Sequence, residues 1–212
     1  IPNTGYDESS SIQYGWLWYP RQVHTDELKE YWEPGLEGVQ QRYVEKLWVN
    51  NPWMIVNENT NSFGNNRLIS NATINYNLTD RLSVRLRYGA DVLDESREYR
   101  RAPSTKAVLL GSYREDKISF SETNAEALVS YQSDRLNGNA IQYDLKVGGN
   151  IMRQKADILI ANNPQLKFFG TDESIYTLTN NRAGVLVESQ STNAGINSLF
   201  ALATVSYKNF LY

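Results

Sequence analysis

A strict alternation of residue types runs from Leu82 to Val92. The even positions of this stretch are apolar or aromatic, and the odd positions between them are Ser, Arg, Gly or Asp. Residues two apart lie on one side of a β-strand, whereas they lie on opposite sides of an α-helix. The stretch therefore predicts a strand with one apolar and one polar face, and it excludes a helix.

A second alternating stretch precedes the first. Most even positions from Ser70 to Leu78 are apolar or aromatic, and the odd positions are Asn or Thr. Only Thr-Asp-Arg at 79–81 separates the two stretches, a length typical of a β-hairpin. We therefore expect a hairpin whose two faces meet different surroundings.

Three further alternating stretches predict three more strands. They lie at 123–131, 141–151 and 196–207, and Phe210 begins a sixth strand. The polar stretches at 94–119 and 152–193 are expected to be long loops, whereas the other connections are short. Transmembrane β-barrels combine short turns on one side with long loops on the other in this way.

The N-terminal part of the chain does not alternate. Residues 1–66 contain all five Trp, and we expect a loop-rich segment with short helices at about 25–29 and 38–48 on the extracellular side. Within it, residues 50–61 are predicted to form turns and polar loop. Residues 67–212 are expected to hold about five antiparallel barrel strands and the start of a sixth.

Charge and hydropathy limit the classes of function. The chain has 21 basic and 24 acidic residues, so no nucleic-acid partner is expected. No run of about 18 apolar residues occurs, so a membrane-spanning helix is not expected either. The mean hydropathy of -0.53 suits a soluble protein, and it also suits a barrel that exposes every second residue to lipid. Because Cys is absent, disulfides and thiolate metal sites are excluded.

The expected strands are too few to close a barrel. Five strands leave two unpaired edges, and each unpaired backbone group in hydrocarbon costs several kcal/mol. The smallest bacterial barrels have about eight strands. The expected fold is therefore all-β: a section of a large antiparallel transmembrane β-barrel with long extracellular loops, incomplete on its own.

The two faces of the expected strands carry different side chains. An aromatic girdle at the lipid interface is expected from the Tyr residues next to the short turns: Tyr76, Tyr131 and Tyr207. The polar rows are expected to face the lumen, where they meet water, a plug or one another: Arg85, Arg87, Asp91, Glu122, Asn124, Glu126, Asp144 and Lys146.

Several short motifs, in this order, resemble the SusC/RagA family of TonB-dependent outer-membrane transporters. They are Asn51-Pro52-Trp53 followed by 57–61, the stretches 77–83 and 87–89, Arg97 with Arg100-Arg101-Ala102-Pro103, the stretch 148–154 and the stretches 196–199 and 207–212. The resemblance implies a large barrel in the outer membrane, filled by a plug and surrounded by outer-membrane lipid. It also implies import of oligosaccharides or peptides with a SusD-like surface lipoprotein. The TonB complex would supply energy through a plug and a contact segment that have no counterpart in this sequence.

Two groups of residues are candidates for contact with substrate, plug or partner. Arg97, Arg100 and Arg101 can bind carboxylates through the planar guanidinium group, or they can pair with Glu95 and Glu98. The second group can stack on sugar rings or form the core of a loop: Trp16, Trp18 and Trp53.

No catalytic or cofactor site is expected. The carboxylates at 94–116 lack a supporting motif for glycoside hydrolysis, so we do not expect an enzyme. Outer-loop carboxylates can bind Ca²⁺, but no EF-hand spacing supports such a site. Two alternatives to the importer stay open. They are a secreted soluble β-sandwich that binds carbohydrate, which would not require detergent, and a passive porin.

Overall fold

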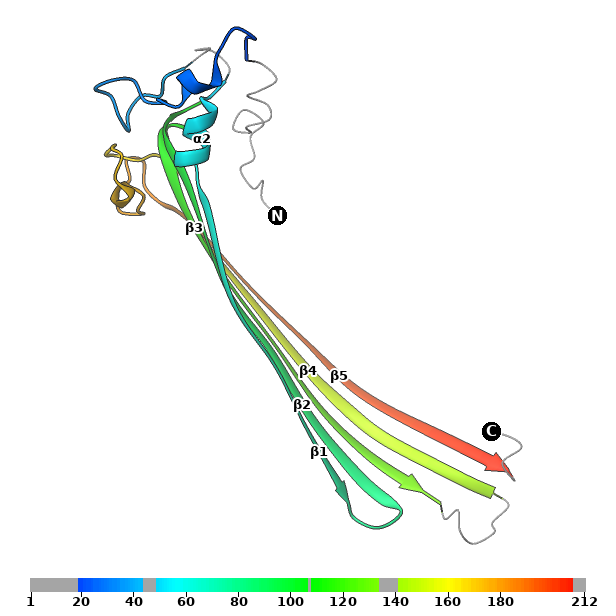
Figure 1. Cartoon of the computed structure of the whole chain (residues 1–212). Coiled ribbons are helices and arrows are strands. Elements are labelled where there is room, and N and C mark those ends of the chain that lie inside the picture. The colour runs from blue at the N-terminus through cyan, green and yellow to red at the C-terminus, as the bar shows by residue number, and fades with distance from the viewer. Residues whose placement is uncertain (1–18, 44–48, 107, 134–140, 208–212) are drawn as a thin grey trace. The chain divides into compact units, whose positions relative to one another are not determined.

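The computed structural model describes residues 19–43, 49–106, 108–133 and 141–207. The strands among them form one open antiparallel sheet. Its five strands follow the chain order β1-β2-β3-β4-β5 (Figure 1). They are β1 (Asn61–Asn77), β2 (Leu82–Thr105), β3 (Val108–Gln132), β4 (Ile141–Asn163) and β5 (Leu186–Tyr207). The expected all-β fold is confirmed. The sixth strand expected at Phe210 lies outside the described residues, as do Trp16 and Trp18.

The strands are longer than the alternation indicates. The stretch 94–119 is not a loop, because β2 continues to Thr105 and β3 begins at Val108. Similarly, the connection expected at 152–193 shortens to 164–185. Both faces of the strands carry polar residues in these stretches, so the period-two signal disappears although the backbone stays extended. The expected regular alternation of short and long connections is therefore wrong at the β2–β3 connection.

Short helices lie before the sheet. The 3-10 helix η2 (Thr25–Leu28) matches the first expected helix, although its N-cap is His24 rather than Thr25. The helix α2 (Pro52–Glu58) lies where turns were expected. In the second expected helix, residues 38–43 instead form a turn and a β-bridge between Trp32 and Gln41, and 44–48 lie outside the described residues. No described helix is long and apolar enough to cross a membrane.

The asparagine before α2 explains why that helix forms. The side chain of Asn51 accepts a hydrogen bond from the backbone N–H of Trp53 at 3.0 Å, as an N-cap does. Pro52 occupies the first turn, where its missing N–H leaves no hydrogen bond unmade. The Asn-Pro pair therefore begins a helix here rather than a turn.

The chain divides into two compact units. We call Ile1–Gly64, Glu95–Lys117 and Ile158–Ser189 the loop unit. The strand unit comprises Asn65–Asp94, Ile118–Asp157 and Gln190–Tyr212.

The loop unit has a hydrophobic core under the β4–β5 connection. Tyr113, Leu166 and Tyr176 are buried together, and the side chains packed against them are Phe169, Ile175 and Leu178. Within the same connection, the side chain of Asn180 accepts a hydrogen bond from the backbone N–H of Phe168 at 2.9 Å. It also donates one to the carbonyl of Ile175 at 2.8 Å. This connection is therefore a folded element and not an irregular strand-to-strand link.

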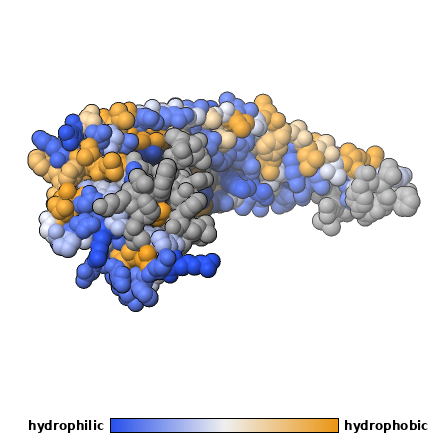
Figure 2. Space-filling view, turned by 90° about the horizontal axis from the view of Figure 1, so that it is seen from above, coloured by the Kyte–Doolittle hydropathy of each residue, from blue (hydrophilic) through white to orange (hydrophobic). Residues whose placement is uncertain are grey.

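The strand unit lacks an enclosed apolar core among its described residues. Leu86, Val129 and Leu145, all on the apolar row, are 49%, 44% and 42% exposed. In Figure 2, hydrophobic and hydrophilic residues separate into neighbouring bands. A β-sandwich buries its apolar rows between two sheets, whereas the described residues form a single sheet. The sandwich alternative is therefore not supported.

Candidate functional site

A hollow of about 420 Å³ lies on the polar face of the strand unit. Five of the residues expected to face a lumen line it: Arg87, Asp91, Glu122, Asn124 and Glu126. Asn71 and Asn150 extend the polar lining on β1 and β4. The structure thus brings most of the expected polar row together in one concave site.

Residues beside the hollow pair across the strands. Arg67 on β1 binds Asp91 on β2 through two nitrogens, at 2.9 and 2.6 Å. Arg85 donates to Asn75, another residue of the polar row, at 3.0 Å, but it does not line the hollow. Asp144 and Lys146 are at even positions of β4, like Asn150, which places them on the same face without lining the hollow.

The hollow has the chemistry of a hydrated binding surface. Its side chains offer carboxylates, amides and one guanidinium group, so it can hydrogen-bond to a polar cargo or to another protein segment. Among the described residues there is no group of three or more His, Asp or Glu placed to hold a metal ion.

The apolar face carries a cluster of Tyr near the short turns. Tyr131 and Tyr143 stack with ring centroids 6.0 Å apart. Tyr76 and Tyr207, also next to turns, are 64% and 48% exposed. The sequence places Tyr143 on the apolar row beside a connection, so the same rule extends the expected girdle to this residue.

The apolar face changes character along the strands. Two residues after Val92 along β2, Asp94 accepts a hydrogen bond from the hydroxyl of Ser119 on β3 at 2.9 Å. Beyond Ile151 on β4, Arg153 donates to Asn197 of β5 at 2.9 Å. The apolar stretch from Ile141 to Ile151 falls within the roughly 9–11 residues that a tilted strand needs to cross a bilayer.

The three arginines of the candidate contact group do not form one cluster. Arg100 and Arg101 are adjacent on β2 and therefore point to opposite faces. Arg97 forms an ion pair with Glu95, and Arg101 donates to Asn61 at 2.9 Å. The expected pairing with neighbouring acids is thus present for Arg97 with Glu95 and for Arg100 with Glu98, both in the loop unit.

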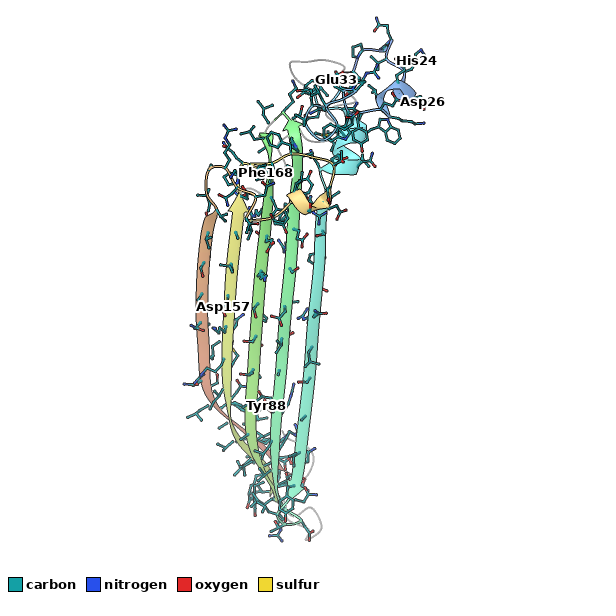
Figure 3. All side chains as sticks on the ribbon, turned by 90° about the vertical axis from the view of Figure 1, so that its left-hand side faces the viewer. His24, Asp26, Glu33, Tyr88, Asp157 and Phe168 are labelled. Carbon is teal, nitrogen blue, oxygen red and sulfur yellow. The ribbon has the colours of Figure 1, made fainter. Side chains whose placement is uncertain are left out.

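Arg100 on β2 contacts the β4–β5 connection within the loop unit. Its guanidinium group contacts Glu98 at 3.4 Å and Glu173 at 3.0 Å, and it lies 5.7 Å from the ring centre of Tyr176. Burial raises the pKa of the Tyr176 hydroxyl, so the ring stays neutral beneath the cation. The same connection carries Phe168, which is 64% exposed and is labelled in Figure 3.

Trp53 lies at the start of α2. Its indole N–H donates to the carbonyl of Thr25 at 3.2 Å, and Lys29 lies 5.7 Å from its ring centre. These contacts hold η2 against α2. Trp53 therefore contributes to packing of the loop unit.

Buried amides are a feature of the loop unit that the sequence pattern did not predict. Gln41, Asn50 and Asn51 are fully buried. Gln41 donates to Asn50 at 2.9 Å and accepts from the backbone N–H of Asn51 at 2.7 Å. The concentration of Asn and Gln near Pro52 is the signal that could have indicated such a network.

The fold of the chain matches solved structures of the RagAB peptide transporter. One RagAB structure matches with a TM-score of 0.68 and 13% identity, over 81% of this chain and 19% of that chain. Structures of the RagAB peptide importer in the 'closed-closed' and 'open-open' states match with a TM-score of 0.66 each. Their identities are 14% and 15%, over 80% and 81% of this chain. This chain spans 19% of the length of those chains.

The structural match supports the expected resemblance. The sequence matches no protein-family model and no curated protein. The resemblance to SusC/RagA proteins is therefore confirmed at the level of the fold, through an open section of antiparallel sheet.

Proposed function

We propose that this chain forms part of the wall of a TonB-dependent importer in the bacterial outer membrane. The observation that carries the proposal is the open sheet itself, which matches RagAB in fold and has an exposed apolar row opposite a polar hollow. The apolar row contacts lipid, and the polar face lines the lumen.

The exposed apolar residues support the membrane placement. Leu86, Val147 and Ile151 are each about half exposed in the isolated chain. Exposing a row of such side chains to water costs about 25 cal/mol per Å² of apolar surface, and lipid removes this cost. The Tyr cluster near the short turns suits the interface on the periplasmic side.

The polar face and the loop unit serve the cargo and the partners. We assign Arg87, Asp91 and Glu126 to the lumen, where they meet water, cargo or a plug. A SusD-like lipoprotein acts as the lid, and the TonB complex acts through parts of the protein beyond this chain. Because the RagAB structures are of a peptide transporter, peptides are the first cargo to test and oligosaccharides the second.

The placement can be tested with the full-length protein. After separation of the membranes, it is expected in the outer-membrane fraction and to require detergent for extraction. Recovery in the soluble periplasmic or secreted fraction without detergent would contradict the proposal.

Transport can be tested with a strain that lacks the gene. Uptake of labelled oligopeptides or oligosaccharides is expected to fall in this strain, and to fall equally when TonB is removed from the parent. Uptake that persists without TonB would indicate the passive porin instead. If only peptide uptake falls, the cargo is a peptide, and if only oligosaccharide uptake falls, the cargo is a sugar.

A further inference from the structure

A groove of about 760 Å³ runs along the apolar face of the strand unit. Its lining includes the small residues Ala125, Ala127 and Gly149 and the polar residues Asn197 and Ser198. Glu126 and Asn150, which line the polar hollow, also border it. Leu86, Ile151 and Leu199 are its larger apolar lining residues, and Leu199 is 93% exposed. Most of the lining residues lie on the face that the proposed function gives to lipid.

The positively charged side chain of Arg153 lines one end of this groove. Arg153 lines it and lies over Gly195, which has no side chain to obstruct the guanidinium group. Its Nη1 donates to Asn197 at 2.9 Å and to the carbonyl of Met152 at 2.8 Å. Among the described residues, no acceptor binds Nε or Nη2, so these donors remain for a ligand.

A second cation follows on the same strand face. Lys155 lies two residues beyond Arg153 and contacts Asp157 at 2.7 Å (Asp157 is labelled in Figure 3). Asp157 also accepts from Ser191 at 2.6 Å. The Lys155–Asp157 pair is exposed, and exposed ion pairs contribute little to stability, so Lys155 can be shared with another anion. One net positive charge remains at this end of the groove.

The cations lie at the depth of a lipid headgroup. The apolar row of β4 ends at Ile151, and Arg153 is the next residue on that face. In a tilted strand, the residues from Ile141 to Ile151 cross the hydrocarbon layer, so Arg153 reaches the far interface. Long basic side chains at such positions extend their charge to the headgroup region.

We propose that this groove binds one acyl chain of a phosphate-bearing lipid, whose phosphate contacts Arg153 and Lys155. The proposal rests on the membrane placement given above. The leaflet is the one on the side of the β4–β5 connection, away from the short turns. A protein partner fits less well, because stable protein interfaces involve about 20–30 residues on each side, and the groove lining is much smaller.

The lipid site can be tested on the full-length protein in a mild detergent. Phosphatidylglycerol is added, and the bound lipid is counted by native mass spectrometry. Each cation near a lipid phosphate contributes about 1 kcal/mol, so Arg153→Ala with Lys155→Ala should weaken binding about 20–30-fold. The matched control is Lys146→Ala, on the polar face of the same strand, which should bind as the parent does.

A second pair of variants tests the groove. Ala127→Phe places a large side chain in the groove lining and should reduce binding several-fold, whereas Ala203→Phe, on the same face outside the groove, should not. Diacylglycerol of equal chain length should bind weakly, and inorganic phosphate should not displace the lipid.

The outcomes separate this proposal from the proposed function. Equal binding of phosphatidylglycerol by the Arg153/Lys155 double variant, or equal retention of diacylglycerol, would overturn the headgroup site while leaving the importer intact. A full-length protein that needs no detergent would instead overturn the membrane placement on which both depend.

Discussion

Buried amide side chains hold the loop unit together. Asn51 accepts from Trp53 N–H and donates to the carbonyls of Leu28 and Arg42, at 3.1 and 3.2 Å. All buried side-chain polar atoms of the described residues have hydrogen-bond partners. An unpaired buried group costs about 1–3 kcal/mol, so such a network stabilises the unit only while it is complete.

We therefore expect Asn51→Ala to destabilise the loop unit by about 1–3 kcal/mol. The substitution removes the N-cap of α2 and leaves two carbonyls without donors. Hydrogen exchange of the α2 amides in the full-length protein measures the opening free energy. Asn57→Ala is the control, because Asn57 is exposed and makes one bond, to the carbonyl of Trp53. Equal protection in the two variants would refute the role of the amide network.

Tyr31 gives the loop unit a pH dependence. Burial and a hydrogen bond from its hydroxyl to Glu58, at 2.9 Å, raise the pKa of Tyr31 to about 12. In the unfolded chain the hydroxyl ionises near pH 10, so the contribution to stability is complete below pH 10 and is lost as the pH rises toward 12. Tyr31→Phe should flatten this part of the stability profile, measured by hydrogen exchange at pH 9 to 12. A profile unchanged by the substitution would mean that another group titrates.

At the scale of elements, the β2–β3 hairpin depends on Gly111. Its φ of +70° is disfavoured for other residues, and a Cβ there would lie 2.8 Å from the carbonyl oxygen of Arg101 and 2.9 Å from Leu166. Gly184 has a φ of +91° but no atom within 4 Å of such a Cβ. The two glycines therefore separate backbone strain from steric overlap.

Gly184→Ala should cost about 1–2 kcal/mol, from the left-handed backbone alone. Gly111→Ala should cost more, because the added methyl group also displaces Leu166 from the core. Both values can be measured as the loss of protease resistance of the β4–β5 connection in the full-length protein. Equal losses would show that the overlap at Gly111 relaxes without cost.

The sequence predicted those strand segments whose two faces differ. Leu82–Val92 and Ile141–Ile151 alternate because one face is apolar, and both lie in strands. The upper part of β2, near Arg97, has polar residues on both faces, so no periodicity distinguished it from a loop. Helix α2 escaped detection because the Asn-Pro pair that begins it also begins many turns.

The candidate site was predictable to the same extent. Alternation placed Arg87, Asp91 and Glu126 on one face, and the structure brings them to one hollow. It could not predict the Arg67–Asp91 pair, because the register between strands sets which residues oppose one another. The contact of Arg100 with Glu173 depends on how the β4–β5 connection folds, which the local sequence does not encode.

At the scale of the whole molecule, a charged residue introduced by mutation should have a different free-energy cost on each of the two faces of the sheet. Leu86 lies on the apolar row and Asn124 lines the polar hollow. A charged residue on the lipid face costs about 2–4 kcal/mol near the bilayer midplane, whereas charge in the lumen is tolerated. Leu86→Arg should therefore lower the amount of folded full-length protein in the outer membrane, and Asn124→Arg should leave it near the parental level. Heat-dependent migration in gels measures the folded fraction. If Asn124→Arg were the more damaging substitution, the assignment of the two faces would be reversed.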